Sequence, residues 1–81
     1  MEIKVLGMGC AKCVRLYDNT QAAIGELGIE AHVEKVMDMA EIAGYGVMST
    51  PALVIDGRVA VMGRVPSKDQ IVSLLQARQG G

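Results

Sequence analysis

The stretch Gly9-Cys10-Ala11-Lys12-Cys13 contains both cysteines of this 81-residue chain, three positions apart. An apolar run precedes it, and a helical pattern of apolar residues begins at Cys10. Unpaired backbone N–H groups and the positive end of the helix dipole lie at a helix start, so the first sulfur is favoured there as a thiolate. The i, i+3 spacing places Cys13 on the same side, within reach of a disulfide. The pair can therefore serve as a redox-active dithiol or as a two-sulfur clamp for a metal ion.

Length and composition predict one domain over residues 1–81, near the lower size limit for a chain that folds alone. The core must be aliphatic, because the chain has no Phe or Trp, and its six methionines help to fill it. A disulfide between the two cysteines would close a very small loop and add little stability, so a purely structural role is disfavoured. We expect Gly80-Gly81 to fray.

Charge and hydropathy narrow the function classes. The formal net charge of −1 provides no basic patch for nucleic acid or an anionic membrane. The apolar run near the N-terminus is short and broken by charges, unlike a signal peptide, and no run approaches a membrane span. We therefore expect a cytoplasmic protein, and in that compartment a CxxC pair is more often catalytic or metal-binding than structural.

Periodicity predicts seven elements in the order β-α-β-α-β-β-α. Strands are expected over 2–6, 29–36, 52–55 and 59–62, and helices over 10–27, 38–44 and 67–78. The residues between the first strand and helix, Gly7-Met8-Gly9, are expected to form a flexible turn. Polar residues alternate with apolar ones along 29–36, which indicates a strand near a sheet edge with one solvent-exposed face.

Local signals support these boundaries. Gly28 is a helix stop, and Asp56-Gly57 is a two-residue hairpin turn. Asp38 with Glu41, and Ser67 with Gln70, have the spacing of capping boxes. A right-handed crossover makes the first two strands parallel, whereas the hairpin adds antiparallel ones. The fold class is therefore α/β: a mixed four-stranded sheet with helices on both faces.

Two segments resemble the thioredoxin fold. One is Cys10-Ala11-Lys12-Cys13 after the first strand, and the other is Tyr45-Gly46-Val47-Met48-Ser49-Thr50-Pro51 before an apolar strand. The resemblance covers nearly the whole chain, in a trimmed form without an extra N-terminal strand and helix. It is closest to the small thioredoxin-like proteins of archaea and bacteria, also called redox-active disulfide proteins. It implies a cis peptide at Pro51, facing the cysteines, and leaves the backbone of Thr50 open to an extended substrate.

The resemblance implies a thiol–disulfide oxidoreductase that reduces protein disulfides and takes part in electron transport. Cys10 would be the nucleophile and Cys13 the resolving cysteine. The redox-active Cys10–Cys13 disulfide would be its only redox group, with no metal and no other cofactor. Expected partners are protein disulfide substrates and a reductase, such as a flavin enzyme, as electron donor. We expect the protein to be a monomer.

Residues around the cysteines are candidates for substrate binding and for tuning the thiolate. Thr50 and Pro51 would position the substrate backbone. An apolar rim for the partner is expected from Met8, Val47, Met48 and Met62. Lys12 either favours the Cys10 thiolate or is simply solvated, and His32 is interpreted as solvated.

The chain departs from the family pattern at several positions. Ala11-Lys12 replaces the usual Gly-Pro between the cysteines, and no Trp flanks them. The acidic residue that assists proton transfer in thioredoxins falls at Lys4, which would favour a thiolate if it lay behind the sulfurs. Met62-Gly63-Arg64 lacks the paired glycines with which glutaredoxins hold glutathione, so glutathione use is not predicted.

A rival hypothesis is copper(I) binding. Gly7-Met8-Gly9-Cys10-Ala11-Lys12-Cys13 also matches the Gly-Met-x-Cys-x-x-Cys motif of copper metallochaperones, and two thiolates suit this soft ion. That fold runs β-α-β-β-α-β and ends in a strand, whereas this sequence predicts a helix after the second strand and another at the end. A third alternative is a non-catalytic thioredoxin-like module that senses redox state.

Overall fold

The computed structural model describes residues 1–79, which form a four-stranded sheet with three helices. The elements are β1 (Glu2–Leu6), α1 (Ala11–Leu27), β2 (His32–Val36), α2 (Met39–Gly44), β3 (Ala52–Ile55), β4 (Arg58–Met62) and α3 (Lys68–Gln79). The predicted number, type and order of elements are confirmed. Gly80 and Gly81, for which fraying was expected, lie outside the described residues.

The sheet has the strand order β2-β1-β3-β4. β1 and β2 are parallel, because α1 crosses over between them, and β3 runs antiparallel to both β1 and β4. β2 is an edge strand, as its alternating polar pattern predicted. The central pair, β1 and β3, ends at Leu6 opposite Ala52, so the residues that follow β1 meet those that precede β3.

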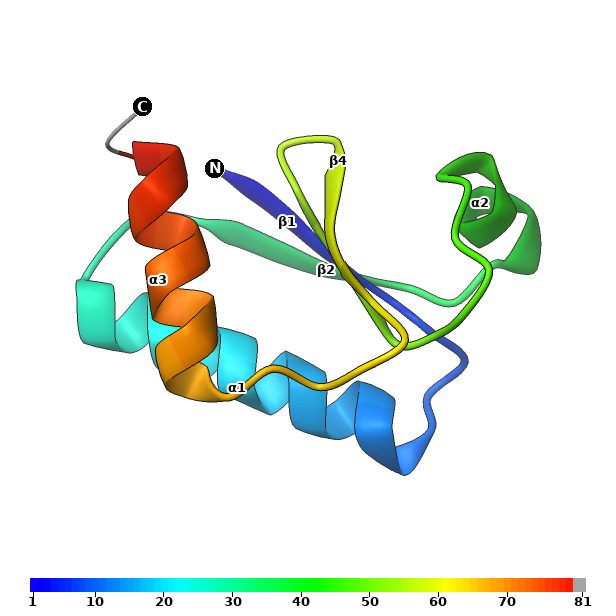
Figure 1. Ribbon diagram of the computed structural model, residues 1–81, viewed down its shortest axis with the longest axis horizontal. Coiled ribbons are helices and arrows are strands. Elements are labelled where there is room, and N and C mark those ends of the chain that lie inside the picture. The colour runs from blue at the N-terminus through cyan, green and yellow to red at the C-terminus, as the bar shows by residue number, and fades with distance from the viewer. Residues whose placement is uncertain (80–81) are drawn as a thin grey trace.

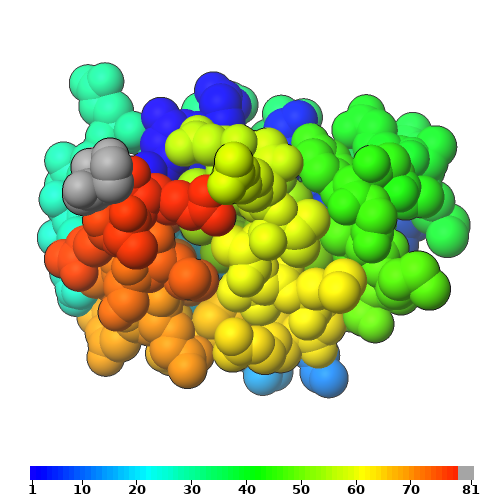
Figure 2. All heavy atoms as spheres, turned by 45° about the horizontal axis from the view of Figure 1, so that its top comes forward, coloured from blue at the N-terminus to red at the C-terminus, as the bar shows by residue number. Residues whose placement is uncertain are grey.

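The two faces of the sheet are covered by different helices, so the fold class is confirmed. Figure 1 shows α1 and α3 crossing below and beside the sheet, whereas α2 lies towards the opposite end. The larger core joins β1, β3 and β4 to α1 and α3 through Ile3, Val5, Leu16, Ala23, Leu53, Ile55, Val61, Ile71 and Leu75. The smaller core, on the other face, contains Leu6, Val36, Ile42, Ala52 and Val54. In Figure 2, α2 and its following loop (green) form one end of the molecule and α3 (orange to red) the other.

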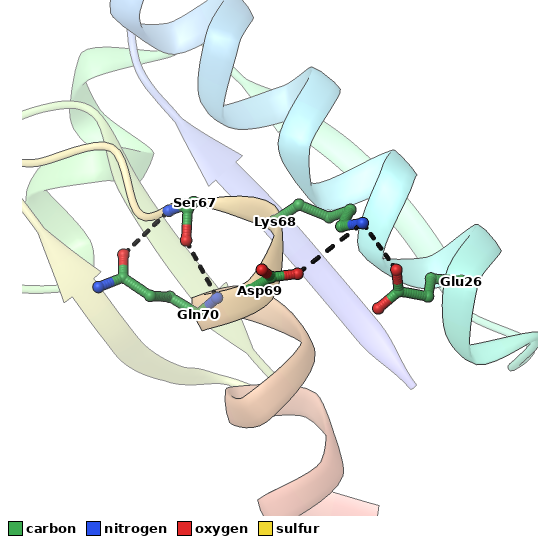
Figure 3. Close-up of polar contacts among 5 residues, drawn as sticks. All are labelled: Glu26, Ser67, Lys68, Asp69 and Gln70. Carbon is green, nitrogen blue, oxygen red and sulfur yellow. Dashed lines mark hydrogen bonds and ion pairs between the residues drawn. The ribbon is translucent and has the colours of Figure 1, made fainter.

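The local signals in the sequence set most of the boundaries. Asp56 and Gly57 adopt φ values of 48° and 83° and join β3 directly to β4. Before α3, the Gln70 backbone N–H donates to Ser67 Oγ over 3.2 Å, and the Ser67 N–H donates to Gln70 Oε1 over 2.9 Å (Figure 3). The capping box at Ser67 and Gln70 is therefore formed in both directions.

Six predicted helix or strand ends differ from the observed ones by one to three residues. α2 begins at Met39 rather than at 38, and α3 spans Lys68–Gln79 rather than 67–78. α1 begins at Ala11, because Cys10 has extended backbone angles (φ −69°, ψ 167°) and acts as the N-cap. β2 begins at His32, the partner of Glu2 in the first β1–β2 pair, and the preceding Ile29 and Ala31 pack against the core without pairing. β4 begins at Arg58, the residue directly after the turn.

Candidate active site

Cys10 occupies the N-cap of α1. Its Sγ accepts a hydrogen bond from the Cys13 backbone N–H over 3.2 Å, and its carbonyl accepts the first helical bond, from Val14 N–H, over 3.0 Å. A helix start presents unpaired N–H groups and a partial positive charge. The first sulfur therefore lies where an anion is stabilised, as the spacing of the motif predicted.

The two sulfurs differ in their exposure to solvent and in their acidity. Cys10 is exposed, whereas Cys13 is 5% exposed, and both are free thiols. The hydrogen bond from the Cys13 thiol, followed by that from the Cys13 backbone N–H, lowers the pKa of the Cys10 thiol. Burial, followed by the hydrogen bond to Cys10, raises the pKa of the Cys13 thiol. The arrangement therefore pairs an exposed, more acidic thiol with a buried, less acidic one.

Gly7 allows the end of β1 to lie directly against the buried sulfur. A Cβ at this position would overlap Cys13 Sγ and would lie 3.9 Å from Thr50 Cβ. The Gly7 N–H is held by the Val36 carbonyl of β2 over 3.0 Å, so the backbone cannot easily move away. Gly7, Cys13 and Thr50 thus meet at one point, at the edge of the site. The sequence indicated only a flexible turn here; the one available signal was a glycine directly after a strand.

Thr50 and Pro51 lie next to the cysteines, between α2 and β3. Their peptide bond is cis. Pro51 is buried, and its carbonyl accepts a hydrogen bond from the Gly63 N–H over 2.9 Å, which ties this loop to the loop after β4. Thr50 is exposed beside Cys13. The loop therefore presents Thr50 at the surface, beside Cys13.

An apolar pocket of about 230 Å³ adjoins Thr50. Met8 comes from the β1–α1 loop, Val47 and Met48 from the loop after α2, and Met39 from the first turn of α2. Met8 and Met48 are 56% and 91% exposed, so their side chains are free to adapt to a partner. Three of the four rim residues expected from the sequence are thus brought together, and Met39 is added because the cap at Asp38 places it at the helix start.

Met62, the fourth expected rim residue, lies apart from this pocket. It pairs with Ala52 at the end of β4 and is 47% exposed. Its neighbour Gly63 has a φ of 76° and lies close to Ser49, where a Cβ would approach Ser49 Cβ to 3.1 Å. Met62 therefore lies outside the pocket, next to a residue that contacts the loop carrying Thr50.

Lys4 does not lie behind the sulfurs. Its Nζ is 5.8 Å from the centroid of the Tyr45 ring, on the α2 face of the sheet. The hydrogen bond to Tyr45, followed by the charge interaction with the same residue, raises the pKa of Lys4. Successive residues of a strand point to opposite faces, and here Val5, not Lys4, faces the cavity beside Cys13. The hypothesis that Lys4 tunes the thiols is therefore wrong.

Lys12 and His32 are both exposed. The backbone N–H of Lys12 is among the donors that lower the pKa of Cys10, after the larger contribution of Cys13. Lys12 thus acts on Cys10 through its place in the first turn of α1. His32 begins the edge strand β2, in agreement with its interpretation as a solvated residue.

Within residues 1–79, His, Cys, Asp and Glu side chains form no group of three or more that could hold a metal ion. The chain also contains α2 and ends in α3, which is not the β-α-β-β-α-β order of copper metallochaperones. In the same described residues, no helix is long and apolar enough to cross a membrane.

Comparison with known proteins agrees with this fold. The thioredoxin domain family model matches residues 1–76. A thioredoxin of Methanothermobacter thermautotrophicus is 43% identical over 75 residues, which cover 93% of this chain and 97% of the relative. A thioredoxin of Methanocaldococcus jannaschii is 39% identical over 75 residues, covering 93% of this chain and 86% of the relative. The chain therefore belongs to the thioredoxin family, and its general activity is that of a thiol–disulfide oxidoreductase.

Proposed function

We propose that this protein reduces disulfides in other proteins, with Cys10 as the nucleophile and Cys13 as the resolving cysteine. One observation supports the assignment above all others: the N-cap sulfur of Cys10 is exposed and accepts a hydrogen bond from the Cys13 backbone N–H, whereas Cys13 is buried. The thiolate is the attacking form, and only an exposed sulfur can reach a protein substrate.

In the first step, the Cys10 thiolate attacks one sulfur of the substrate disulfide. A mixed disulfide forms between Cys10 and the substrate, and the other substrate sulfur leaves as a thiolate. Thr50 is an exposed residue. Its backbone can pair with an extended segment of the substrate next to the attacked sulfur. Pro51 fixes the loop that presents Thr50, and the pocket lined by Met8 and Met48 receives an apolar side chain of the substrate.

In the second step, Cys13 loses its proton and attacks Cys10 Sγ. The mixed disulfide breaks, the Cys10–Cys13 disulfide forms, and the substrate leaves with both of its sulfurs reduced. Two electrons have then passed from the protein to the substrate. A reductase must return them for another cycle, as expected of a protein whose relatives are named thioredoxins. The cycle uses no redox group other than the two sulfurs.

Trapping with single-cysteine variants tests these roles. Cys13→Ser should accumulate a mixed disulfide with insulin, because the nucleophile remains and the resolving thiol is gone. Cys10→Ser is the matched control and should form none, since Cys13 is buried. The wild type, supplied with dithiothreitol as electron donor, should reduce insulin through many turnovers. A mixed disulfide on Cys10→Ser, but not on Cys13→Ser, would contradict the assignment.

A further inference from the structure

A cavity of about 230 Å³ lies against Cys13. Val5 and Gly7 form one wall of the cavity at the end of β1, and Val14 belongs to α1. Val14 and Met37, which also line it, are 48% and 50% exposed, so the cavity reaches the surface of the molecule. A volume of this size holds several water molecules, each of which takes roughly 30 Å³ in the liquid. Solvent can therefore approach Cys13 by a route other than the substrate site.

Lys35 of β2 is the only residue with a basic or acidic side chain, apart from Cys13 itself, among the described residues that line this cavity. Its Nζ is 4.4 Å from the centroid of the Tyr17 ring, a distance typical of a cation–π contact. Tyr17 lies four residues after Cys13, one turn further along the same helix. The Tyr17 hydroxyl in turn accepts a hydrogen bond from Gln21 Nε2 over 2.9 Å. The ammonium group of Lys35 is thus held over Tyr17, one turn beyond the buried thiol, and the exposed Lys35 lines the same cavity as Cys13.

A positive charge near Cys13 would favour the resolving step. Cys13 must become a thiolate before it can attack, yet burial favours its protonated form. The position at which family members carry an assisting acid is Lys4 here, and Lys4 contacts Tyr45 on the opposite face of the sheet. No carboxylate lines the cavity within the described residues. A nearby cation lowers the free energy of the thiolate relative to the thiol.

We propose that Lys35, held over Tyr17 beside the cavity, is a positioning residue that favours the Cys13 thiolate in the resolving step. The proposal rests on the proposed function, because it requires Cys13 to be the resolving cysteine. The Cys13 thiol gives its proton to water in the cavity. The resulting thiolate attacks Cys10 Sγ and forms the Cys10–Cys13 bond, while the bond from Cys10 to the substrate breaks and its electron pair leaves with the substrate sulfur.

Other charged groups near Cys13 do not replace Lys35. Cys10 is bonded to the substrate at this stage and carries no charge. β1 contributes Val5 and Gly7 to the cavity, and neither has a titratable side chain. Glu34 is the neighbour of Lys35 on β2. Its charge helps to raise the pKa of Lys4, after the larger effect of Tyr45, on the opposite face of the sheet. Lys12 of α1 is exposed and is not among the residues that line the cavity.

The two chemical steps can be measured separately in a stopped-flow reaction with the uncharged aromatic disulfide dithiodipyridine. Attack by Cys10 releases a first thiopyridone, and attack by Cys13 on the mixed disulfide releases a second. The variants are Lys35→Met, the conservative Lys35→Arg, and Arg58→Met as a control that removes an exposed cation at the far end of β4. Each is followed from neutral to alkaline pH, and thermal unfolding of each variant shows whether it is folded.

In Lys35→Met, the second release should slow about threefold to tenfold at neutral pH, and its pH profile should move about half a unit to one unit upwards. The first release should not change, and Lys35→Arg should restore the second. The proposal is overturned if Lys35→Met leaves the second profile in place, or if Arg58→Met shifts it equally. Failure of the proposed function looks different: Cys10→Ser would then give the first release at the wild-type rate.

Discussion

The helices α1 and α3 begin in contrasting ways. α3 begins after Ser67, whose hydroxyl accepts from the Gln70 N–H while the Gln70 side chain accepts from the Ser67 N–H (Figure 3). α1 begins after Cys10, whose sulfur alone accepts from the Cys13 N–H. An oxygen is the better cap, since serine ranks among the preferred N-cap residues. The chain therefore uses a stabilising cap where the helix only has to fold and a reactive one where chemistry takes place.

This contrast separates two properties that one helix start can have. At Ser67, the two side chains of the capping box satisfy the backbone N–H groups of Ser67 and Gln70. At Cys10, the sulfur is exposed. The hydrogen bond from the Cys13 thiol lowers the pKa of Cys10 most, and backbone N–H groups of the helix start lower it further. Stability and activity should therefore respond in opposite ways to substitutions at the two positions.

The largest effect is expected for Cys10→Ser. Insulin reduction should be lost entirely, because no exposed nucleophile remains. The free energy of unfolding of the reduced protein should not fall, and a gain of about 0.5 kcal/mol is expected because serine is the better cap. Urea unfolding under reducing conditions, beside the insulin assay, checks both parts. A variant that is both inactive and clearly destabilised would break the contrast, since the sulfur would then be structural.

Gly7→Ala should come next. The added Cβ would overlap Cys13 Sγ, so the sulfur or the end of β1 must move, with an expected loss of about 1–3 kcal/mol. Resolution of a mixed disulfide should also slow, because Cys13 is displaced. Gly25→Ala is the matched control: nothing lies within 4 Å of its Cβ, and alanine in a helix should add up to about 1 kcal/mol. Equal effects at the two glycines would show that Gly7 has no special role.

Ser67→Ala should affect stability alone. Loss of the hydroxyl cap should lower the free energy of unfolding by about 1 kcal/mol, while the rate of insulin reduction stays unchanged. Thermal or urea unfolding and the insulin assay provide the two measurements. A change in reduction rate at constant stability would contradict the separation between the two helix starts.

The smallest effect is expected for Glu26→Gln. Glu26 Oε1 lies 2.7 Å from Lys68 Nζ, which links the end of α1 to the start of α3 (Figure 3). The hydrogen bond to Glu26 raises the pKa of Lys68, but both side chains are about half exposed and solvent screens the pair. The unfolding midpoint should shift less than in Ser67→Ala, and the difference should vanish at high salt. A shift larger than that of Ser67→Ala would make this pair a main support of α3.

The local features of the fold were predictable from the sequence because each depends on residues close in the chain. Gly28 adopts a φ of 65° where the helix stop was expected. Asp38 accepts hydrogen bonds from the N–H groups of Ala40 and Glu41 where a cap was expected. The dithiol was predictable for the same reason, since its geometry follows from a three-residue spacing at a helix start.

The side chains around Cys13 were harder to predict because they come from three separate elements. Lys4 and Val5 point to opposite faces of β1. A shift of the strand by one position would exchange the residue that faces the thiol. The contact between Lys35 and Tyr17 appears only once β2 and α1 are packed together. The close approach of Gly7 to Cys13 likewise depends on how the end of β1 packs against α1.

The most direct test of the central claim measures both sulfurs in one reduced wild-type sample. Iodoacetamide is added at a series of pH values, and mass spectrometry quantifies alkylation at Cys10 and Cys13 separately. The pKa of Cys10 is lowered and that of Cys13 is raised. The alkylation rate of Cys10 should therefore be half-maximal at a pH below about 8.5, the pKa of an ordinary thiol. Cys13 should react only in alkaline solution. Superimposed profiles, both centred near the ordinary value, would contradict the account.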